Sequence, residues 1–262
     1  MDLTYLNLGG IDLRNGDFLF WTRNLLNSEN KVVTNDIYSP GTSFNRTKVN
    51  QRKFVLNGHI RKDIAKNWSL LNSVLIRSEL IPLAVSIPGM VTTVINVAVE
   101  NVIYNEPQMD EVSISLVAPD PRLYALNEQV IDLTGSSVNA LVYPITYPIT
   151  YGSITGLKGM LVNAGNTIAY PRFEIYGPCS NILLKNNTTG QVMNFNITLD
   201  AGDTLEVDCA PLVREIKLNG VKNMGLKEGD WITCIPGNNE IEIDRTSLVG
   251  NNAQAFLRSA WL

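Results

Sequence analysis

The feature that most constrains the fold of this chain is an alternation of apolar and polar residues with a period of two. It is clear in residues 112–118 and 205–209, and similar short stretches recur along most of the 262 residues. Successive side chains of a β-strand point to opposite faces, so this alternation is typical of strands that bury one face. The sequence therefore predicts a mainly β, β-rich protein.

One segment departs from this pattern and predicts a helix over about residues 63–79. Its apolar residues are spaced by four, three and four: Ile64, Trp68, Leu71 and Leu75. That spacing places them on one face of an amphipathic helix. Leu70, Val74 and Ile76 widen the stripe and predict deep burial, and Pro82 stops the helix.

The length favours about two domains, because it exceeds the usual size of one. We predict a sheet-plus-helix domain over 1–128, with a polar, Asn-rich segment at 24–50 that could project as a hairpin or arm. Short strands separated by turns predict a β-sandwich over 129–262. The tandem Tyr-Pro-Ile-Thr repeat at 143–150 indicates an extended edge or linker, because proline disfavours a central strand.

Composition and charge argue against several classes of partner. Charged residues make up 18% of the chain and the net charge is −4, without a basic stripe that could neutralise many phosphates. We therefore expect no nucleic acid as a partner. The most apolar stretch, 80–99, contains prolines and glycine and indicates strands, not membrane insertion. The first residues predict no secretory signal, because no positive region with an apolar stretch follows Met1, and the three separated cysteines predict reduced, mostly buried thiols.

The residue types that usually carry chemistry are sparse or better explained structurally. The single histidine, His59, reads as a strand residue, and no Walker-type or dinucleotide-binding loop is present. Glu206 with Asp208 and Glu240 with Glu242 have the two-residue spacing of carboxylates on one strand face, about 7 Å apart. Alternating acids are also the solvated face of a half-buried strand. We therefore predict no catalytic residues, no cofactor and no metal.

Three tyrosines, Tyr143, Tyr147 and Tyr151, recur every four residues around the repeat. In an extended segment this spacing puts them on one face, where they could stack on a sugar or pack against protein. We favour packing in a core or an interface.

The order of turns and strands resembles the distal tail proteins (Dit) of siphophages, long-tailed phages of Gram-positive bacteria. In the first half, a strand over 114–118 runs into Pro-Asp-Pro. In the second half, the likeness runs through 173–181, 188–190, 199–205, 213–220 and 235–239. The turn residues that carry the pattern are Pro119, Asp120, Pro121, Gly177, Pro178, Gly190, Gly202, Asp203, Asn219, Gly220, Pro236, Gly237 and Asn238.

The resemblance implies a structural virion protein assembled in the host cytoplasm and placed at the phage tail tip. Its N-terminal domain would form a homo-oligomeric ring, a hexamer, and its C-terminal domain would be a galectin-like β-sandwich. The implied partners are other copies of the chain, the tail-tube protein, a tail-tip, hub or tail-associated protein of the baseplate, and a receptor-binding protein.

Two other functions stay open at this point. The C-terminal half could be a carbohydrate-binding module for host cell-wall polysaccharide, because a fold of this kind does not by itself decide its ligand. A wall glycosidase would have to use one of the carboxylate pairs.

Overall fold

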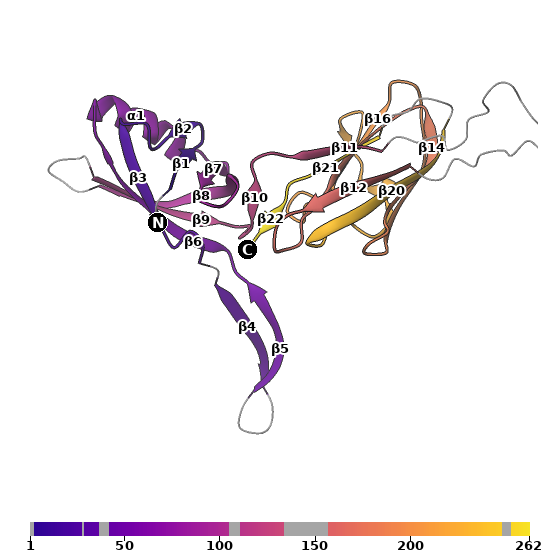
Figure 1. The fold of residues 1–262 in the computed structure, drawn as a ribbon, viewed down its shortest axis with the longest axis horizontal. Coiled ribbons are helices and arrows are strands. Elements are labelled where there is room, and N and C mark those ends of the chain that lie inside the picture. Colours follow the sequence, from indigo (N-terminus) through magenta and orange to yellow (C-terminus); the bar gives the residue numbers. More distant parts are fainter. Residues whose placement is uncertain (1–2, 28, 37–41, 105–110, 134–156, 248–252) are drawn as a thin grey trace, which may run out of the picture. The chain divides into compact units, whose positions relative to one another are not determined.

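In the computed structural model (Figure 1), the described residues are 3–27, 29–36, 42–104, 111–133, 157–247 and 253–262. They divide into two compact units. Unit 1 contains Met1–Leu126 with Trp261–Leu262, and unit 2 contains Asn127–Ala260. The predicted division into two independent domains, 1–128 and 129–262, stays a prediction.

Unit 1 is built on one large antiparallel sheet with the order β2-β1-β7-β8-β9-β6-β3. Its strands are β1 (Tyr5–Leu8), β2 (Ile11–Asp12), β3 (Phe18–Arg23), β6 (Arg52–Ile60), β7 (Ile81–Ser86), β8 (Thr93–Tyr104) and β9 (Glu111–Ala118). Strand β10 (Leu123–Ala125) also pairs with β8. A second, two-stranded sheet consists of β4 (Asn30–Asp36) and β5 (Thr42–Val49).

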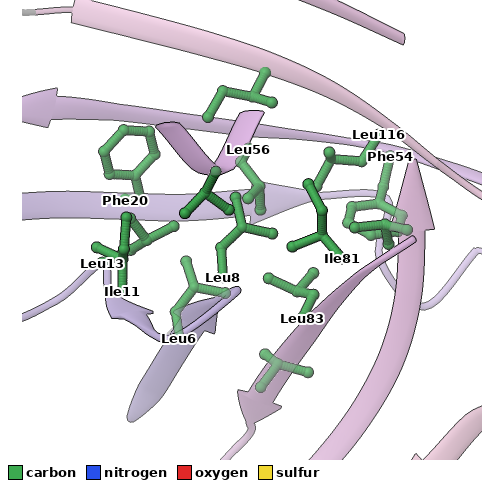
Figure 2. Packing of buried hydrophobic residues seen from close by; sticks show 14 of the residues in the cluster. Leu6, Leu8, Ile11, Leu13, Phe20, Phe54, Leu56, Ile81, Leu83 and Leu116 are labelled. Carbon is green, nitrogen blue, oxygen red and sulfur yellow. The ribbon is translucent and has the colours of Figure 1, made fainter. Parts of the chain in front are cut away.

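The core of unit 1 lies between one face of this sheet and the helix α1 (Ile64–Leu75). Figure 2 shows leucine, isoleucine and phenylalanine side chains from β1, β6, β7 and β9 meeting in one cluster. Each such side chain stabilises the fold by about 1.5–3 kcal/mol when it is fully buried. The alternating pattern of β9, in which every second residue is buried, is the one that the sequence predicts.

The predicted helix exists, but it is shorter than expected and buries a narrower stripe. Its last turn tightens after Leu75, where the amide of Arg77 donates to the carbonyl of Val74 at 3.3 Å. The buried residues are Asn67, Leu71, Val74 and Leu75. Ile64, Leu70 and Ile76 are exposed, and Ile76 is 74% exposed. The prediction of deep burial was wrong because the helix meets apolar side chains on only one side.

Unit 2 is a sandwich of two antiparallel sheets. One has the order β11-β21-β13-β16-β17-β18, and the other has the order β12-β20-β14-β15-β19. The first contains β11 (Gln129–Asp132), β13 (Arg172–Tyr176), β16 (Thr204–Asp208), β17 (Glu215–Leu218), β18 (Val221–Lys222) and β21 (Ala253–Leu257). The second contains β12 (Leu157–Asn163), β14 (Cys179–Asn186), β15 (Gln191–Leu199), β19 (Glu228–Gly229) and β20 (Gly237–Ser247).

The inward-facing residues of both sheets form the core of unit 2. They include Phe173, Ile175, Leu184, Phe195, Val207 and Ile243, none of which is exposed. A short 3-10 helix, η1 (Met224–Leu226), follows β18, and β22 (Ala260–Trp261) ends the chain. The predicted fold class, mainly β with one helix in the first half and a β-sandwich in the second, is confirmed.

Candidate assembly surfaces

The β4–β5 ribbon is the most exposed regular structure of unit 1. Its strands pair only with each other, and Figure 1 shows the hairpin extending beyond the sheet of unit 1. It lies within the Asn-rich segment 24–50. A two-stranded hairpin is only marginally stable alone in water, and no other strand in the described part of the chain pairs with this ribbon.

The register of the ribbon gives it two different faces. Thr34 lies opposite Phe44 and Val32 opposite Thr47, and these side chains share one face because directly paired residues point the same way. Phe44 is 67% exposed and Val32 is 56% exposed. The other face carries three cations: Lys31, Arg46 and Lys48. One face is therefore apolar and uncovered, and the other is basic.

A buried arginine stands where β6 begins, at the base of the ribbon. Arg52 is 1% exposed, and its Nη1 donates to the carbonyl of Leu25 at 2.5 Å. Its Nε and Nη2 have no hydrogen-bond partner among the described residues. Burial lowers the pKa of the guanidinium because it penalises the charged form. The charge is thus held in the core with one carbonyl for a partner.

In unit 2, three buried asparagine side chains fix the irregular segment 230–236. The Nδ2 of Asn239 donates to the carbonyl of Ile235 at 2.8 Å, and its Oδ1 accepts from the amide of the same residue at 3.0 Å. The Nδ2 of Asn186 donates to the carbonyl of Thr233 at 2.7 Å. The Nδ2 of Asn163 donates to the carbonyl of Cys234 at 3.2 Å. Buried backbone groups need hydrogen-bond partners. In this segment the side-chain amides of the three asparagines supply partners that a neighbouring strand would supply in a regular sheet.

Three of the turns that carry the family pattern meet at one end of unit 2. The carboxylate of Asp203 accepts from the Nδ2 of Asn219 at 2.8 Å and from the amide of Asp200 at 2.8 Å. These hydrogen bonds, first that from Asn219, lower the pKa of Asp203. A Cβ on Gly177 would lie 2.1 Å from the carbonyl oxygen of Asp200. The Gly177-Pro178 peptide at this junction is cis.

The remaining pattern residues lie elsewhere. Gly190, which closes the β14–β15 hairpin, and Gly237 in the Pro236–Asn238 turn both adopt a positive φ. The loops beside them are joined where the amide of Glu240 donates to Thr188 at 2.9 Å. Pro119 and Pro121 belong to unit 1, and between them Asp120 accepts from the hydroxyl of Tyr124 at 2.7 Å. These residues shape turns, and none of them lines a reactive site.

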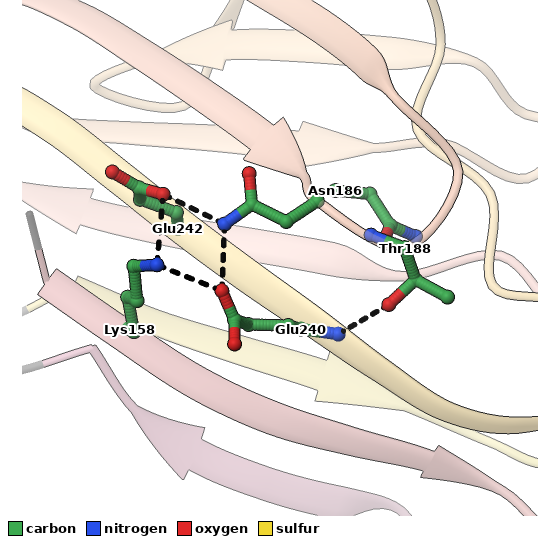
Figure 3. Close-up of polar contacts among 6 residues, drawn as sticks. Lys158, Asn186, Thr188, Glu240 and Glu242 are labelled. Atoms are coloured by element: carbon green, nitrogen blue, oxygen red, sulfur yellow. Dashed lines mark hydrogen bonds and ion pairs between the residues drawn. The ribbon is translucent and has the colours of Figure 1, made fainter.

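The carboxylates considered for catalysis are already engaged. Lys158 contacts Glu240 at 2.8 Å and Glu242 at 3.5 Å (Figure 3). Asn187 donates to the same two residues at 2.8 and 2.7 Å. These contacts lower the pKa of both glutamates, mainly through Lys158 for Glu240 and Asn187 for Glu242. A glycosidase needs one carboxyl with a raised pKa as its general acid, so this pair is poorly suited.

The second pair is spread over a charged sheet face. Glu206 lies opposite Glu174 and Lys217, and Asp208 lies opposite Arg172 and Glu215. The Oδ1 of Asp208 accepts from the amide of Ala210 at 2.8 Å. His59 stands on β6 beside Trp21, with ring centroids 5.8 Å apart. Neither arrangement brings a base to a nucleophile.

Several sequence predictions fall outside the part of the chain that the structure describes. Tyr143, Tyr147 and Tyr151 and the Tyr-Pro-Ile-Thr repeat lie within residues 134–156. Among the described residues, no three His, Cys, Asp or Glu side chains gather as a metal site would require. No helix in the described ranges is long and apolar enough to span a membrane. All three cysteines are buried free thiols, as predicted.

Part of unit 2 matches a family model of phage tail components. Residues 164–253 match the family model of the siphovirus-type tail component, C-terminal domain. No curated protein sequence matches the chain.

Solved structures resemble the chain over nearly its full length. The Dit protein (gp 19.1) of phage SPP1, described as a paradigm of the hub adsorption apparatus in phages that infect Gram-positive bacteria, has a TM-score of 0.67 at 14% identity. That alignment covers 98% of this chain and 99% of the SPP1 protein. A chain of the phage P2 baseplate in its activated conformation with Ca has a TM-score of 0.56 at 10% identity, covering 99% and 98%.

At these identities the structures establish a shared fold, and the family match extends the likeness to the sequence of unit 2. The predicted resemblance to the siphophage distal tail proteins is confirmed.

Proposed function

We propose that this chain, whose second unit carries the siphovirus-type tail component domain, is a structural distal tail protein of a bacteriophage. Its first unit would form a ring, a hexamer, that connects the tail tube to the baseplate or tail tip. The observation that carries this proposal is the β4–β5 ribbon, whose apolar face is uncovered in the single chain.

A ring explains why such a ribbon exists. Closed rings use heterologous contacts, in which one surface of a subunit binds a different surface of the next. A projecting ribbon suits this arrangement, because it can reach a neighbour without moving the subunit core. Covering Phe44 and Val32 would bury apolar area at about 25 cal/mol per Å², which favours association over exposure.

The likeness to the SPP1 hub protein and to a chain of the P2 baseplate supports a proposal for the partners and the location. The tail-tube protein would bind one side of the ring. A tail-tip, hub or tail-associated protein would bind the other, and a receptor-binding protein would attach further out. The chain would be assembled in the host cytoplasm and reside at the tail tip of the virion.

A non-enzymatic role agrees with the state of the carboxylates. The hydrogen bonds that lower the pKa of Glu240 and Glu242 keep both ionised, so neither is poised to donate a proton at neutral pH. The same groups are hydrogen-bonded to Lys158 and Asn187, which satisfies them without a sugar. Among the described residues, the contacts of these carboxylates therefore do not favour the carbohydrate-binding alternative.

The test is the mass of the purified full-length protein in solution at several concentrations, together with negative-stain electron microscopy. We expect rings with a central hole, and six subunits by mass. The paired variant Val32→Ser with Phe44→Ser should shift the protein to monomers. The matched control Val130→Ser, at an exposed valine of β11, should leave the rings unchanged.

Because some rings form only on a template, a monomeric protein would next be mixed with purified tail tubes. If no ring forms with or without tubes, the ring is ruled out. Binding of the monomer to soluble cell-wall polysaccharide would then support the carbohydrate-binding alternative.

A further inference from the structure

A second exposed apolar surface lies at one corner of unit 2, where β17 and β18 end the six-stranded sheet. The amide of Asn223 donates to the carbonyl of Ile216 at 2.8 Å, which places the first residue after β18 beside β17, the strand that follows Arg214. We name this surface the Trp231 patch. It consists of the half-buried Trp231 with Arg214 and Lys227, whose cations lie near its ring, and of three exposed residues that are close to these cations in the chain: Leu212, Val213 and Met224.

The apolar part of the patch is unusually open. Leu212 is 65% exposed, and Val213 and Met224 are also exposed. Single exposed apolar residues are ordinary, but contiguous exposed apolar patches are typical of binding surfaces, and here three large exposed residues stand within three positions of Arg214 or Lys227 in the chain. Tryptophan and arginine are also the residues most enriched among those that dominate binding energy at interfaces.

Two cations sit against the tryptophan ring. The Cζ of Arg214 lies 5.7 Å from the ring centroid of Trp231, and the Nζ of Lys227 lies 5.0 Å from it. Both distances are within the range of cation–π attraction. Lys227 also donates to the carbonyl of Gly229. Neither cation forms an ion pair with a carboxylate in the described part of the chain, so both can accept an acidic partner.

The backbone holds Arg214 in place at a conformational cost. Its φ is 36°, in the left-handed region that residues with a Cβ rarely adopt. The turn is fixed because the amides of Val213 and Arg214 both donate to the carbonyl of Ala210, at 2.9 and 2.7 Å. Strained residues of this kind cluster where a protein contacts a ligand or partner.

The segment beneath Trp231 is also rigid. Ile232 and Cys234, which alternate with the half-buried Trp231 and Thr233, are fully buried. The amide of Thr233 donates to the Oε1 of Gln191 at 2.8 Å, and its carbonyl accepts from Asn186. A pre-organised surface binds more tightly, because less conformational freedom is lost on association.

We infer that the Trp231 patch is a docking site for another protein of the tail assembly, one that presents an apolar side chain flanked by carboxylates. This inference rests on the proposed function and names a partner surface within it. The exposed aliphatic groups require an apolar counterpart, and Arg214 and Lys227 require negative charge. A polysaccharide would stack on a bare aromatic ring, whereas this ring already has two cations against it.

The test uses photo-crosslinking in phage tails assembled with the full-length chain. Leu212 is replaced by the photo-reactive p-benzoyl-phenylalanine, and crosslinked peptides are identified by mass spectrometry. The same replacement at Met160, an exposed residue of β12, is the control. We expect position 212 to crosslink to an acidic segment of a different tail protein, and position 160 to give no such product.

The identified segment, as a synthetic peptide, then gives a quantitative measure of binding. Arg214→Glu and Leu212→Ser should each weaken its affinity about tenfold or more, and Met160→Ser should leave it unchanged. Arg214→Gly removes the cation but relieves the positive φ. It should therefore fold at least as stably as the native chain while still binding more weakly.

A crosslink to a second copy of this chain, to wall polysaccharide or to nothing would overturn the inference. So would equal peptide binding by the Arg214 variants and the native chain. These outcomes leave the proposed function standing if the chain is present in tails. Absence of the chain from purified tails would instead count against the proposed function itself.

Discussion

The β4–β5 ribbon of unit 1 and the 230–236 segment of unit 2 both lie outside the main sheets, but they differ in how their polar and apolar groups are accommodated. Neither is a strand of the large sheet of unit 1 or of the two sandwich sheets of unit 2. In unit 2, side-chain amides from Asn163, Asn186 and Asn239 satisfy the irregular backbone within the chain. In unit 1, the ribbon bonds only to itself, and Phe44 stays exposed.

The difference indicates which parts of the molecule are complete in a single chain. In the 230–236 segment of unit 2, backbone groups find hydrogen-bond partners within the chain. The stability of this segment should therefore depend on these hydrogen bonds. In unit 1, the apolar side chains of the ribbon are exposed, and Nε and Nη2 of the buried Arg52 have no hydrogen-bond partner among the described residues. The stability of this region should therefore depend on what surrounds it in an assembly. Variants in the two regions should therefore behave differently in the isolated protein.

The largest effect is expected from Asn239→Ala in unit 2. The change removes three hydrogen bonds to the backbone around Ile235 and Gly237 and leaves buried groups unpaired. We expect the free energy of unfolding to fall by about 2–4 kcal/mol, measured by denaturant titration. The exposed neighbour provides the control, since Asn238→Ala should cost less than about 0.5 kcal/mol. Equal losses at both positions would contradict the role of Asn239.

A smaller effect of opposite sign is expected from Arg52→Met in unit 1. A buried guanidinium without a carboxylate costs desolvation energy, and an apolar side chain of similar length removes that cost. We expect the free energy of unfolding of the isolated protein to rise by about 1–3 kcal/mol in the same titration. As a control, Lys53→Met on the same strand should change it by no more than about 1 kcal/mol, because the Lys53–Glu100 pair is exposed. A destabilised Arg52→Met protein would show that the charge is satisfied within the chain.

A change that depends on pH is expected at the joined turns of unit 2. The pKa of Asp203 is lower in the folded protein than in the unfolded chain, mainly through the hydrogen bond from Asn219. The stabilisation is therefore fully present above the unfolded pKa and is lost as the pH falls through the folded pKa. As the pH falls from neutral to strongly acidic, the native protein should therefore lose more stability than Asp203→Asn. Parallel pH profiles of the two proteins would show that the contact does not favour the charged form.

The smallest effect is expected from Phe44→Ser in the ribbon. The side chain is exposed and its strand pairs only with β4, so the free energy of unfolding of the isolated protein should change by less than about 0.5 kcal/mol. Phe195→Ser, in the core of unit 2, serves as the comparison and should destabilise strongly. A large loss at Phe44 would mean that the ribbon packs on the rest of the chain, and the contrast between the two regions would disappear.

Some features of this protein follow from the sequence alone. The period-two pattern of residues 112–118 determines a strand with one buried face, because neighbouring side chains must point in opposite directions. Asn219-Gly220 determines a hairpin turn, since both residues tolerate the positive φ that they adopt. The spacing of Leu71, Val74 and Leu75 likewise determines a helix with a buried side.

Other features were decided by tertiary structure. The sequence gives Ile76 and Leu71 similar hydrophobicity, but only Leu71 meets the sheet. Asn239 looks like a turn residue, and its burial depends on the loop of Asn186, which is distant in sequence. The Trp231 patch depends in the same way on Arg214 and Lys227 reaching one ring. Local patterns fix the directions of neighbouring side chains, whereas the partner of a side chain depends on which distant strands pair, and that is settled only when the whole core is packed.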